Sequence, residues 1–193
     1  MRIFLIAVSI YFAFQQAAFA HVGAGVLGGF TSGVAHPILG PDHLIAMFAV
    51  GVWGAFLKGK AVWVLPVVFP LVMAIGGVFG ILGINIPAIE IGIALSSIVI
   101  GAFIALAVKL PLWATGLIVG IFAIFHGYAH GAELPTAANP LAYAVGFVLA
   151  TGFLHLLGIG FGYMVRWPAG RMVIRTSGVA IALAGVFFFV GLT

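Results

Sequence analysis

The sequence contains no cysteine and very few charged residues. Without cysteine the chain cannot form disulfide bonds, cysteine-ligated iron–sulfur clusters or thiolate metal sites. Charged residues make up only 5% of the 193 residues, whereas globular domains carry about a quarter. A chain so poor in charge lacks the polar surface to cover a ball of its size in water, which excludes a water-soluble protein.

Apolar residues fill most of the chain instead: 65% are hydrophobic, and the mean hydropathy is +1.37. A membrane-spanning helix needs about 20 apolar residues, so the length allows six or seven spans with short turns and no separate soluble domain. The seven Lys and Arg residues are scattered among apolar runs and form no patch for nucleic acid. We therefore expect an all-α, polytopic integral membrane protein with no nucleic-acid partner.

Residues 1–20 have the features of a cleavable signal peptide. Arg2 gives a positive start, residues 3–14 are apolar, and Ala18-Phe19-Ala20 matches an A-x-A cleavage site. The apolar run ends early for a full span, although an uncleaved first transmembrane helix is the alternative. Cleavage would leave a single transmembrane domain at residues 21–193 that begins with His21.

Six long apolar segments follow, at residues 41–57, 61–84, 88–108, 112–131, 140–164 and 172–192. Every basic residue after Arg2 lies in or beside alternate breaks between them: Lys58, Lys60, Lys109, Arg166, Arg171 and Arg175. The positive-inside rule places these breaks in the cytoplasm and the intervening connections in the periplasm of a bacterial inner membrane.

Residues 22–36 do not fit a further span in this topology, because His21 and residues 37–41 would both lie outside. The segment is also short and contains five glycines. We predict a re-entrant or half-inserted helix packed against a bundle of about six transmembrane helices. The alternative is seven full crossings, which would turn the basic loops outward.

The ionisable residues form two groups, and such residues in membrane spans are functional candidates by default. In the first group, His36, Asp42 and His43 surround two prolines and a glycine, which forbid a continuous helix and start a new one near Pro41. Asp42 could cap that helix and accept the ring N–H of a neighbouring histidine, which would orient it for a metal. The alternative is a loop whose histidines face water.

The second group is His126, His130 and Glu133. Their spacing places all three on one stripe of a helix, as in helices that present several ligands to one divalent ion. Gly127 stands where the zinc-protease motif H-E-x-x-H requires glutamate, which disfavours a metalloprotease. A plain polar helix end is the alternative.

Three further candidates stand alone in the sequence. His155 lies among leucines, and is either a relay or a histidine bonded to a neighbouring helix. Glu90 begins an apolar segment on the outer side, and His21 at a mature N-terminus would offer an amine and an imidazole. Nitrogen and oxygen donors without thiolate suit Ni²⁺, Co²⁺ or Zn²⁺ as a bound substrate ion, and do not choose among them.

Two motifs carry a family resemblance. His36-Pro37-x-x-Gly40-x-Asp42-His43 and Phe125-His126-Gly127-x-Ala129-His130-Gly131-x-Glu133 resemble the two signatures of the HupE/UreJ family of nickel permeases. The likeness extends over nearly the whole chain. It implies that the histidines and carboxylates of both motifs bind the transported metal, and that the protein supplies nickel, or in some members cobalt, to enzymes such as hydrogenase and urease.

The expected function is therefore transport of Ni²⁺ or Co²⁺ from periplasm to cytoplasm, by a protein that is not an enzyme and has no prosthetic group. No Walker motif is present, so a facilitator or an ion-coupled carrier is expected. The expected partners are the metal ion and the lipid bilayer, with nickel-enzyme maturation proteins and a homo-oligomer as further candidates. The alternatives are a haem-binding oxidoreductase subunit, a metal-binding accessory or sensor protein, and an intramembrane hydrolase.

Overall fold

The computed structural model describes residues 25–134 and 139–192, and within these ranges the chain is all-helical. The predicted signal peptide and His21 lie outside the described residues. The elements are α2 (Gly25–Leu39), α3 (Pro41–Leu57), α4 (Ala61–Ile81), α5 (Ile89–Ala105), α6 (Leu112–Ala132), α7 (Pro140–Gly162), the 3₁₀ turn η2 (Tyr163–Arg166) and α8 (Pro168–Val190). The helical bundle predicted from composition is thus confirmed for the described part.

Four helices are long and apolar enough to cross a membrane: α4, α6, α7 continued through η2, and α8. The pair α2 and α3 meets the same test together but is bent by 77° at its break, and α5 is shorter. Each of the six predicted segments overlaps one helix. The number of spans, and whether the bent pair is a broken span or a re-entrant loop, stay predictions.

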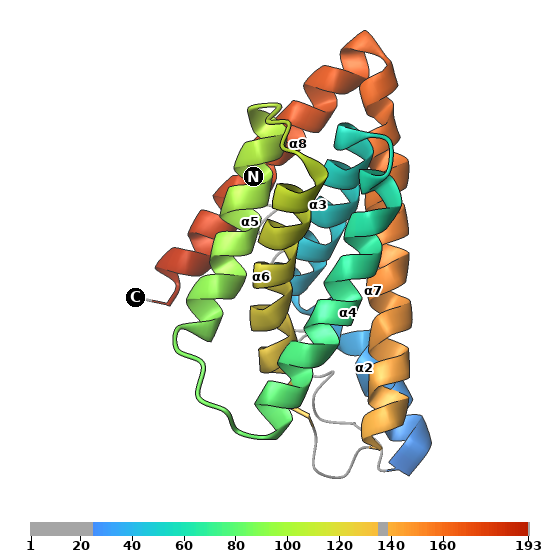
Figure 1. Cartoon of the computed structure of the whole chain (residues 1–193), viewed down its shortest axis with the longest axis vertical. Coiled ribbons are helices and arrows are strands. Elements are labelled where there is room, and N and C mark those ends of the chain that lie inside the picture. The colour runs from blue at the N-terminus through green and yellow to red at the C-terminus, as the bar shows by residue number, and fades with distance from the viewer. Residues whose placement is uncertain (1–24, 135–138, 193) are drawn as a thin grey trace, which may run out of the picture.

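The basic residues gather at one end of the bundle. From α3 to α8 successive helices alternate in direction, and the connections after α3, α5 and α7 all lie at the upper end of Figure 1. Lys58, Lys60 and Lys109 line one surface cavity there, and Arg166 lines a second one with Lys58. The end of α2, the α4–α5 connection and the end of α6 lie at the opposite end.

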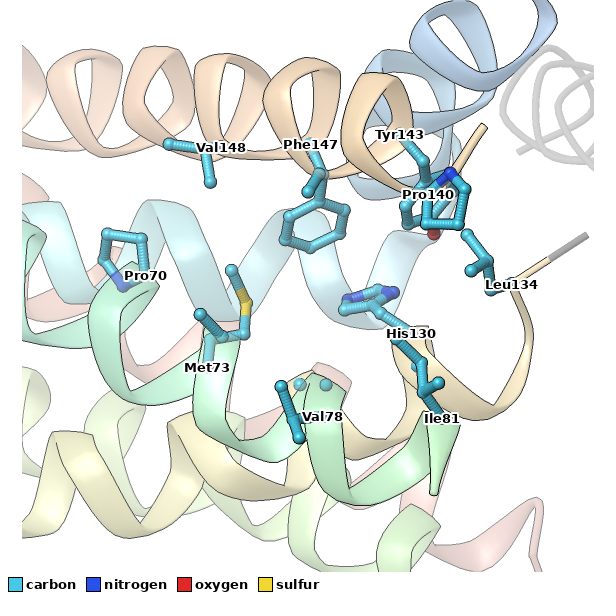
Figure 2. A pocket seen from close by; sticks show the side chains of 15 residues that line it. Pro70, Met73, Val78, Ile81, His130, Leu134, Pro140, Tyr143, Phe147 and Val148 are labelled. Atoms are coloured by element: carbon cyan, nitrogen blue, oxygen red, sulfur yellow. The ribbon is translucent and has the colours of Figure 1, made fainter. Parts of the chain in front are cut away.

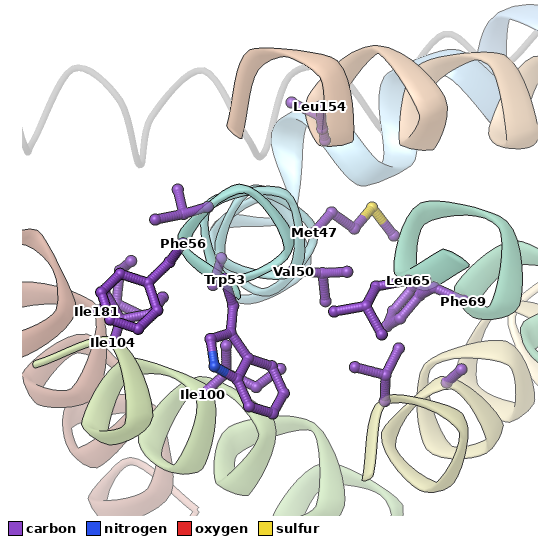
Figure 3. Packing of buried hydrophobic residues seen from close by; sticks show 14 of the residues in the cluster. Met47, Val50, Trp53, Phe56, Leu65, Phe69, Ile100, Ile104, Leu154 and Ile181 are labelled. Atoms are coloured by element: carbon purple, nitrogen blue, oxygen red, sulfur yellow. The ribbon is translucent and has the colours of Figure 1, made fainter. Parts of the chain in front are cut away.

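Helix α3 forms the centre of the bundle and packs against α4, α5, α7 and α8. In the view along α3 in Figure 3, Trp53 and Phe56 point toward α5 and α8, whereas Met47 points toward α4. Trp53 lies 5.2 Å from Phe103, between ring centroids. Because other helices pack against α3 on several sides, the side chains at its N-terminal end are held in fixed positions.

Glycines set the close approach of α4 to α6. A side chain at Gly127 would collide with the carbonyl oxygen of Met73, and one at Gly131 with that of Gly77. Two further pairs of glycines four residues apart, Gly76/Gly80 and Gly158/Gly162, also lie against the backbone of a neighbouring helix, as small residues in membrane helices allow. Gly116 and Gly120 have the same spacing but make no such close contact: an added Cβ has nothing within 4 Å at Gly116 and meets only the Val72 side chain, at 3.9 Å, at Gly120.

Candidate metal site

The break between α2 and α3 brings the first motif to a corner of the bundle. The predicted break with a new helix near Pro41 is confirmed, although Pro37 itself lies inside α2, which continues to Leu39. Gly40 alone interrupts the two helices, and Pro41 occupies the first turn of α3, where its missing N–H is tolerated. The sharp turn places His36, from the last turn of α2, beside His43 in the first turn of α3, with ring centroids 5.6 Å apart.

Three histidines from three helices meet at this corner. His130 of α6 lies 4.6 Å from His36 and 4.4 Å from His43, between ring centroids. One ring nitrogen from each of the three can be chosen so that all lie within 4.8 Å of one another. We call His36, His43 and His130 the outer cluster. His43 and His130 are buried, at 6% and 5% exposure, so their ring nitrogens are shielded from water.

Asp42 orients one member of the outer cluster. Its Oδ1 lies 2.8 Å from Nδ1 of His43 and also accepts the backbone N–H of His43 at 2.9 Å. Asp42 does not cap the helix as the sequence suggested, because Gly40 is the N-cap residue of α3 and no side chain caps this end. Since a carboxylate can only accept, Nδ1 of His43 carries the proton and Nε2 is the nitrogen left to bind a metal; it has no other partner in the described residues.

His126 adjoins the outer cluster from the next turn of α6. Its ring is 5.2 Å from that of His43, and its Nδ1 donates to the carbonyl of Phe122 at 2.9 Å. The lone pair of Nε2 is therefore bare, and this buried atom has no hydrogen-bond partner among the described residues. Two neighbouring histidines, His43 and His126, thus present Nε2 as a donor to a metal for the same structural reason.

Of two further carboxylates, one contacts the outer cluster and the other does not. Glu133, just past the end of α6, places Oε2 at 3.5 Å from Nε2 of His36. Partial burial raises the pKa of Glu133; His43 opposes this change, while Glu90 and Asp42 add to it. Glu90 itself lies exposed in the first turn of α5, and it lines a cavity of 220 Å³ that also borders Asp42. The structure therefore does not bring Glu90 into the outer cluster.

His155 lies deeper, in the middle of α7, and is only 1% exposed. Neither ring nitrogen forms a well-aligned hydrogen bond within the described part of the chain. It is separated from the outer cluster, and its ring contacts Phe69, with centroids 5.4 Å apart. The imidazole interacts with the Pro66 backbone of α4, so the relay and the histidine bonded to a neighbouring helix both stay predictions.

Sequence reasoning missed the aromatic residues that enclose the histidines. Phe147 of α7 packs 4.1 Å from His130, and Tyr143 lies 6.5 Å from His36. Figure 2 shows His130 and these two aromatic side chains around an apolar cavity of 270 Å³ between α4, α6 and α7. Phe147 follows Tyr143 by four residues and His155 follows Phe147 by eight, and this spacing is the signal that indicates one common face of α7.

Chemically, the site offers neutral imidazole nitrogens backed by carboxylates in surroundings that exclude water. Such donors suit a borderline divalent cation, because a hard ion such as Mg²⁺ prefers more oxygen ligands. The carboxylates Asp42 and Glu133 supply negative charge that offsets the charge of the ion, and Asp42 does so without occupying Nε2 of His43.

Comparison with known proteins agrees with the motifs. The family described as HupE / UreJ protein matches residues 8–188. The chain is 47% identical over 179 residues to Protein HupE of Rhizobium leguminosarum bv. viciae, covering 93% of each chain. No solved structure matches. With a family match over most of its length and a close relative aligned almost end to end, the chain belongs to the HupE/UreJ family.

Proposed function

We propose that the chain is a permease that carries a borderline divalent metal ion, Ni²⁺ or Co²⁺, across a bacterial inner membrane. The observation that carries this proposal is the outer cluster, in which three buried or half-buried histidines from α2, α3 and α6 meet inside a bundle of apolar helices. Histidines held so close without a metal repel one another whenever they are protonated, so the arrangement is best explained by a cation that binds the neutral rings.

The proposed orientation places the outer cluster toward the periplasm. It is supported by the gathering of Lys58, Lys109 and Arg166 at the end of the bundle opposite the cluster. In this topology α3 to α8 provide the six crossings, α2 is a re-entrant helix that follows a cleaved signal peptide, and the ion moves toward the cytoplasm.

The proposed transport begins with capture of the ion at the corner between α2 and α3. Glu133 and His36 lie nearest the surface, where they attract the cation and begin to replace its water. The buried Nε2 atoms of His43 and His126 then continue the line of donors inward. Transport requires binding that is strong enough to remove water from the ion and weak enough to release it, which several neighbouring sites provide better than one.

This proposal makes the protein a facilitator or an ion-coupled carrier and not an enzyme. It would supply nickel to enzymes such as hydrogenase or urease, with their maturation proteins as partners on the cytoplasmic side. A metal sensor or accessory protein needs no ionisable group beyond the binding site, whereas His155 continues the series of imidazoles toward the middle of α7. That buried histidine favours transport over binding alone.

The proposal is tested by nickel uptake in cells that express the chain, with cobalt and zinc as competitors. We expect saturable uptake that cobalt reduces and that His36→Ala abolishes, while the amount of protein in the membrane is unchanged. Arg171→Gln serves as a control, because this exposed residue lies at the opposite end of the bundle. A haem absorption band in the purified protein, without metal uptake, would favour the oxidoreductase alternative.

A further inference from the structure

We propose that Phe69 of α4 is the barrier that separates the outer cluster and His126 from an inner ion-binding position at His155. This inference rests on the proposed transport function and assigns the step at which passage of the ion is controlled. The inner position takes the same class of ligand, a borderline divalent cation, with one imidazole and a backbone carbonyl as donors.

The first support is the position of Phe69 between the two histidines. Its ring centroid is 5.5 Å from that of His126 and 5.4 Å from that of His155, and both contacts are edge-on. Phe69 and His126 are completely buried, and His155 is 1% exposed. An ion that moves from His126 to His155 therefore meets the phenyl ring on its most direct route.

The second support comes from two prolines in the same helix. Pro66 and Pro70 lie four residues apart inside α4, and Pro70 has no N–H to donate to the carbonyl of Pro66. The Pro66 backbone interacts with the His155 imidazole, although no well-aligned hydrogen bond forms between them. A backbone group that lacks its usual helical donor and a buried imidazole thus face each other beside Phe69.

The third support is the composition of the layer around Phe69. Met47 lies one turn beyond His43 on α3, and Thr151 lies one turn before His155 on α7; the Thr151 hydroxyl donates to the Met47 sulfur at 3.4 Å. Both side chains are completely buried. Figure 3 shows Met47 directed toward α4, the helix that carries Phe69. The layer between the histidines is therefore mainly apolar, and its hydroxyl is already engaged.

An apolar layer of this kind stops ions because it excludes water. The ring of Phe69 contacts both His126 and His155 and so occupies the space beside each of them. A hydrated cation cannot pass a dry constriction unless the ring moves aside, and hydrophobic constrictions control conduction in channels in this way. The side chain of Phe69 therefore determines the rate of transfer without determining how tightly the outer cluster binds.

The test uses the absence of cysteine from the native sequence. In the otherwise cysteine-free His155→Cys protein, purified in detergent, reaction of the thiol with Ag⁺ is followed by the loss of later labelling with a maleimide. We expect slow reaction when Phe69 is present and reaction at least about tenfold faster in the Phe69→Leu background, because the smaller side chain opens the constriction. Prior addition of Ni²⁺ should slow the faster reaction, since the route passes the outer cluster.

Phe56→Leu is the matched control. It shortens another buried phenylalanine of the core, which points toward α5 and α8 and away from the histidines, so it loosens the bundle without opening this route. Equal acceleration by Phe56→Leu, or no acceleration by Phe69→Leu, would overturn the proposal. Phe69→Trp provides a second measurement: it should slow nickel uptake several-fold while nickel binding stays within about twofold of the native value. Unchanged uptake with this larger side chain would also contradict a barrier at Phe69.

The two proposals fail in different ways. Native protein that takes up no nickel, while Phe69→Leu still exposes residue 155, would remove the permease function and leave the barrier in place. Native protein that transports nickel, while residue 155 reacts equally fast with and without Phe69, would remove the barrier and leave the permease function.

Discussion

Asp42 and His43 are neighbours in the sequence, and the Asp42 carboxylate receives both the backbone N–H and the ring Nδ1–H of His43, at 2.9 and 2.8 Å. The carboxylate thereby fixes which nitrogen of His43 faces the rings of His126 and His130. It also increases the basicity of the imidazole that binds the ion. Asp42, at the start of α3, thus orients His43 as a metal ligand at the place where the two sequence motifs meet.

Asp42→Asn is expected to weaken nickel binding by about 10–100-fold, because the amide can still accept a hydrogen bond but no longer supplies negative charge. Isothermal titration of the purified protein with Ni²⁺ measures the change. Glu90→Gln is the matched control, since it removes one negative charge from an exposed position near Asp42 but outside the outer cluster. Equal losses in the two variants would assign the effect to general electrostatics and not to His43.

Nickel should stabilise the folded protein, and its removal should reverse the effect. At a free concentration 100 times the dissociation constant, a ligand of the native state alone adds about 2.7 kcal/mol. We expect Ni²⁺ to raise the unfolding temperature, chelation with EDTA to restore the lower value, and Mg²⁺ to have little effect. In His130→Ala the rise should be largely lost; a rise of native size would place the binding site elsewhere.

Acid should weaken nickel binding and transport. Imidazole binds metal only when neutral, so protons compete with the ion increasingly as the pH falls. The pKa of Glu133 is raised by burial, so its carboxylate takes up a proton in milder acid than an exposed glutamate and then ceases to attract the cation. Nickel affinity, measured by titration between about pH 5 and 8, should therefore decrease less steeply toward acid pH in Glu133→Gln than in the native protein. A pH-independent affinity would be incompatible with histidine ligands.

Gly127→Ala should destabilise the bundle by about 1–3 kcal/mol, because the new methyl group collides with the backbone of α4 at Met73. Gly116→Ala, in the same helix, has nothing within 4 Å of the added Cβ and should be neutral or slightly stabilising, since alanine favours helix over glycine. Thermal unfolding of both variants provides the comparison. A larger loss in Gly116→Ala would contradict the described contact between α4 and α6.

Much of the candidate site was predictable because the residues of each motif lie close together in the sequence. The interval from His126 to His130 and Glu133 predicts one face of a helix, and α6 runs through to Ala132 with Glu133 immediately after it. The helix starts at Pro41 and Pro140 also follow from proline chemistry. The apolar run at residues 172–192 predicted the start of α8 a few residues too late. The same proline rule, applied to Pro168, would have given the correct start.

Other features depend on tertiary contacts that sequence spacing does not contain. Gly116/Gly120 and Gly76/Gly80 have the same spacing, yet only the second pair is in close contact with the backbone of another helix. Phe69 is one of 18 phenylalanines, and nothing local distinguishes it from the others. Its contacts with His126 and His155 arise because α4, α6 and α7 meet.

The central claim is that the outer cluster conducts a divalent ion across the membrane, and radioactive nickel uptake by proteoliposomes that contain only the purified chain tests it most directly. The account predicts saturable uptake that cobalt inhibits and that is lost in His130→Ala, although this variant inserts normally. Tight nickel binding to the native protein without any uptake would contradict the account and identify a protein that binds the metal but does not transport it.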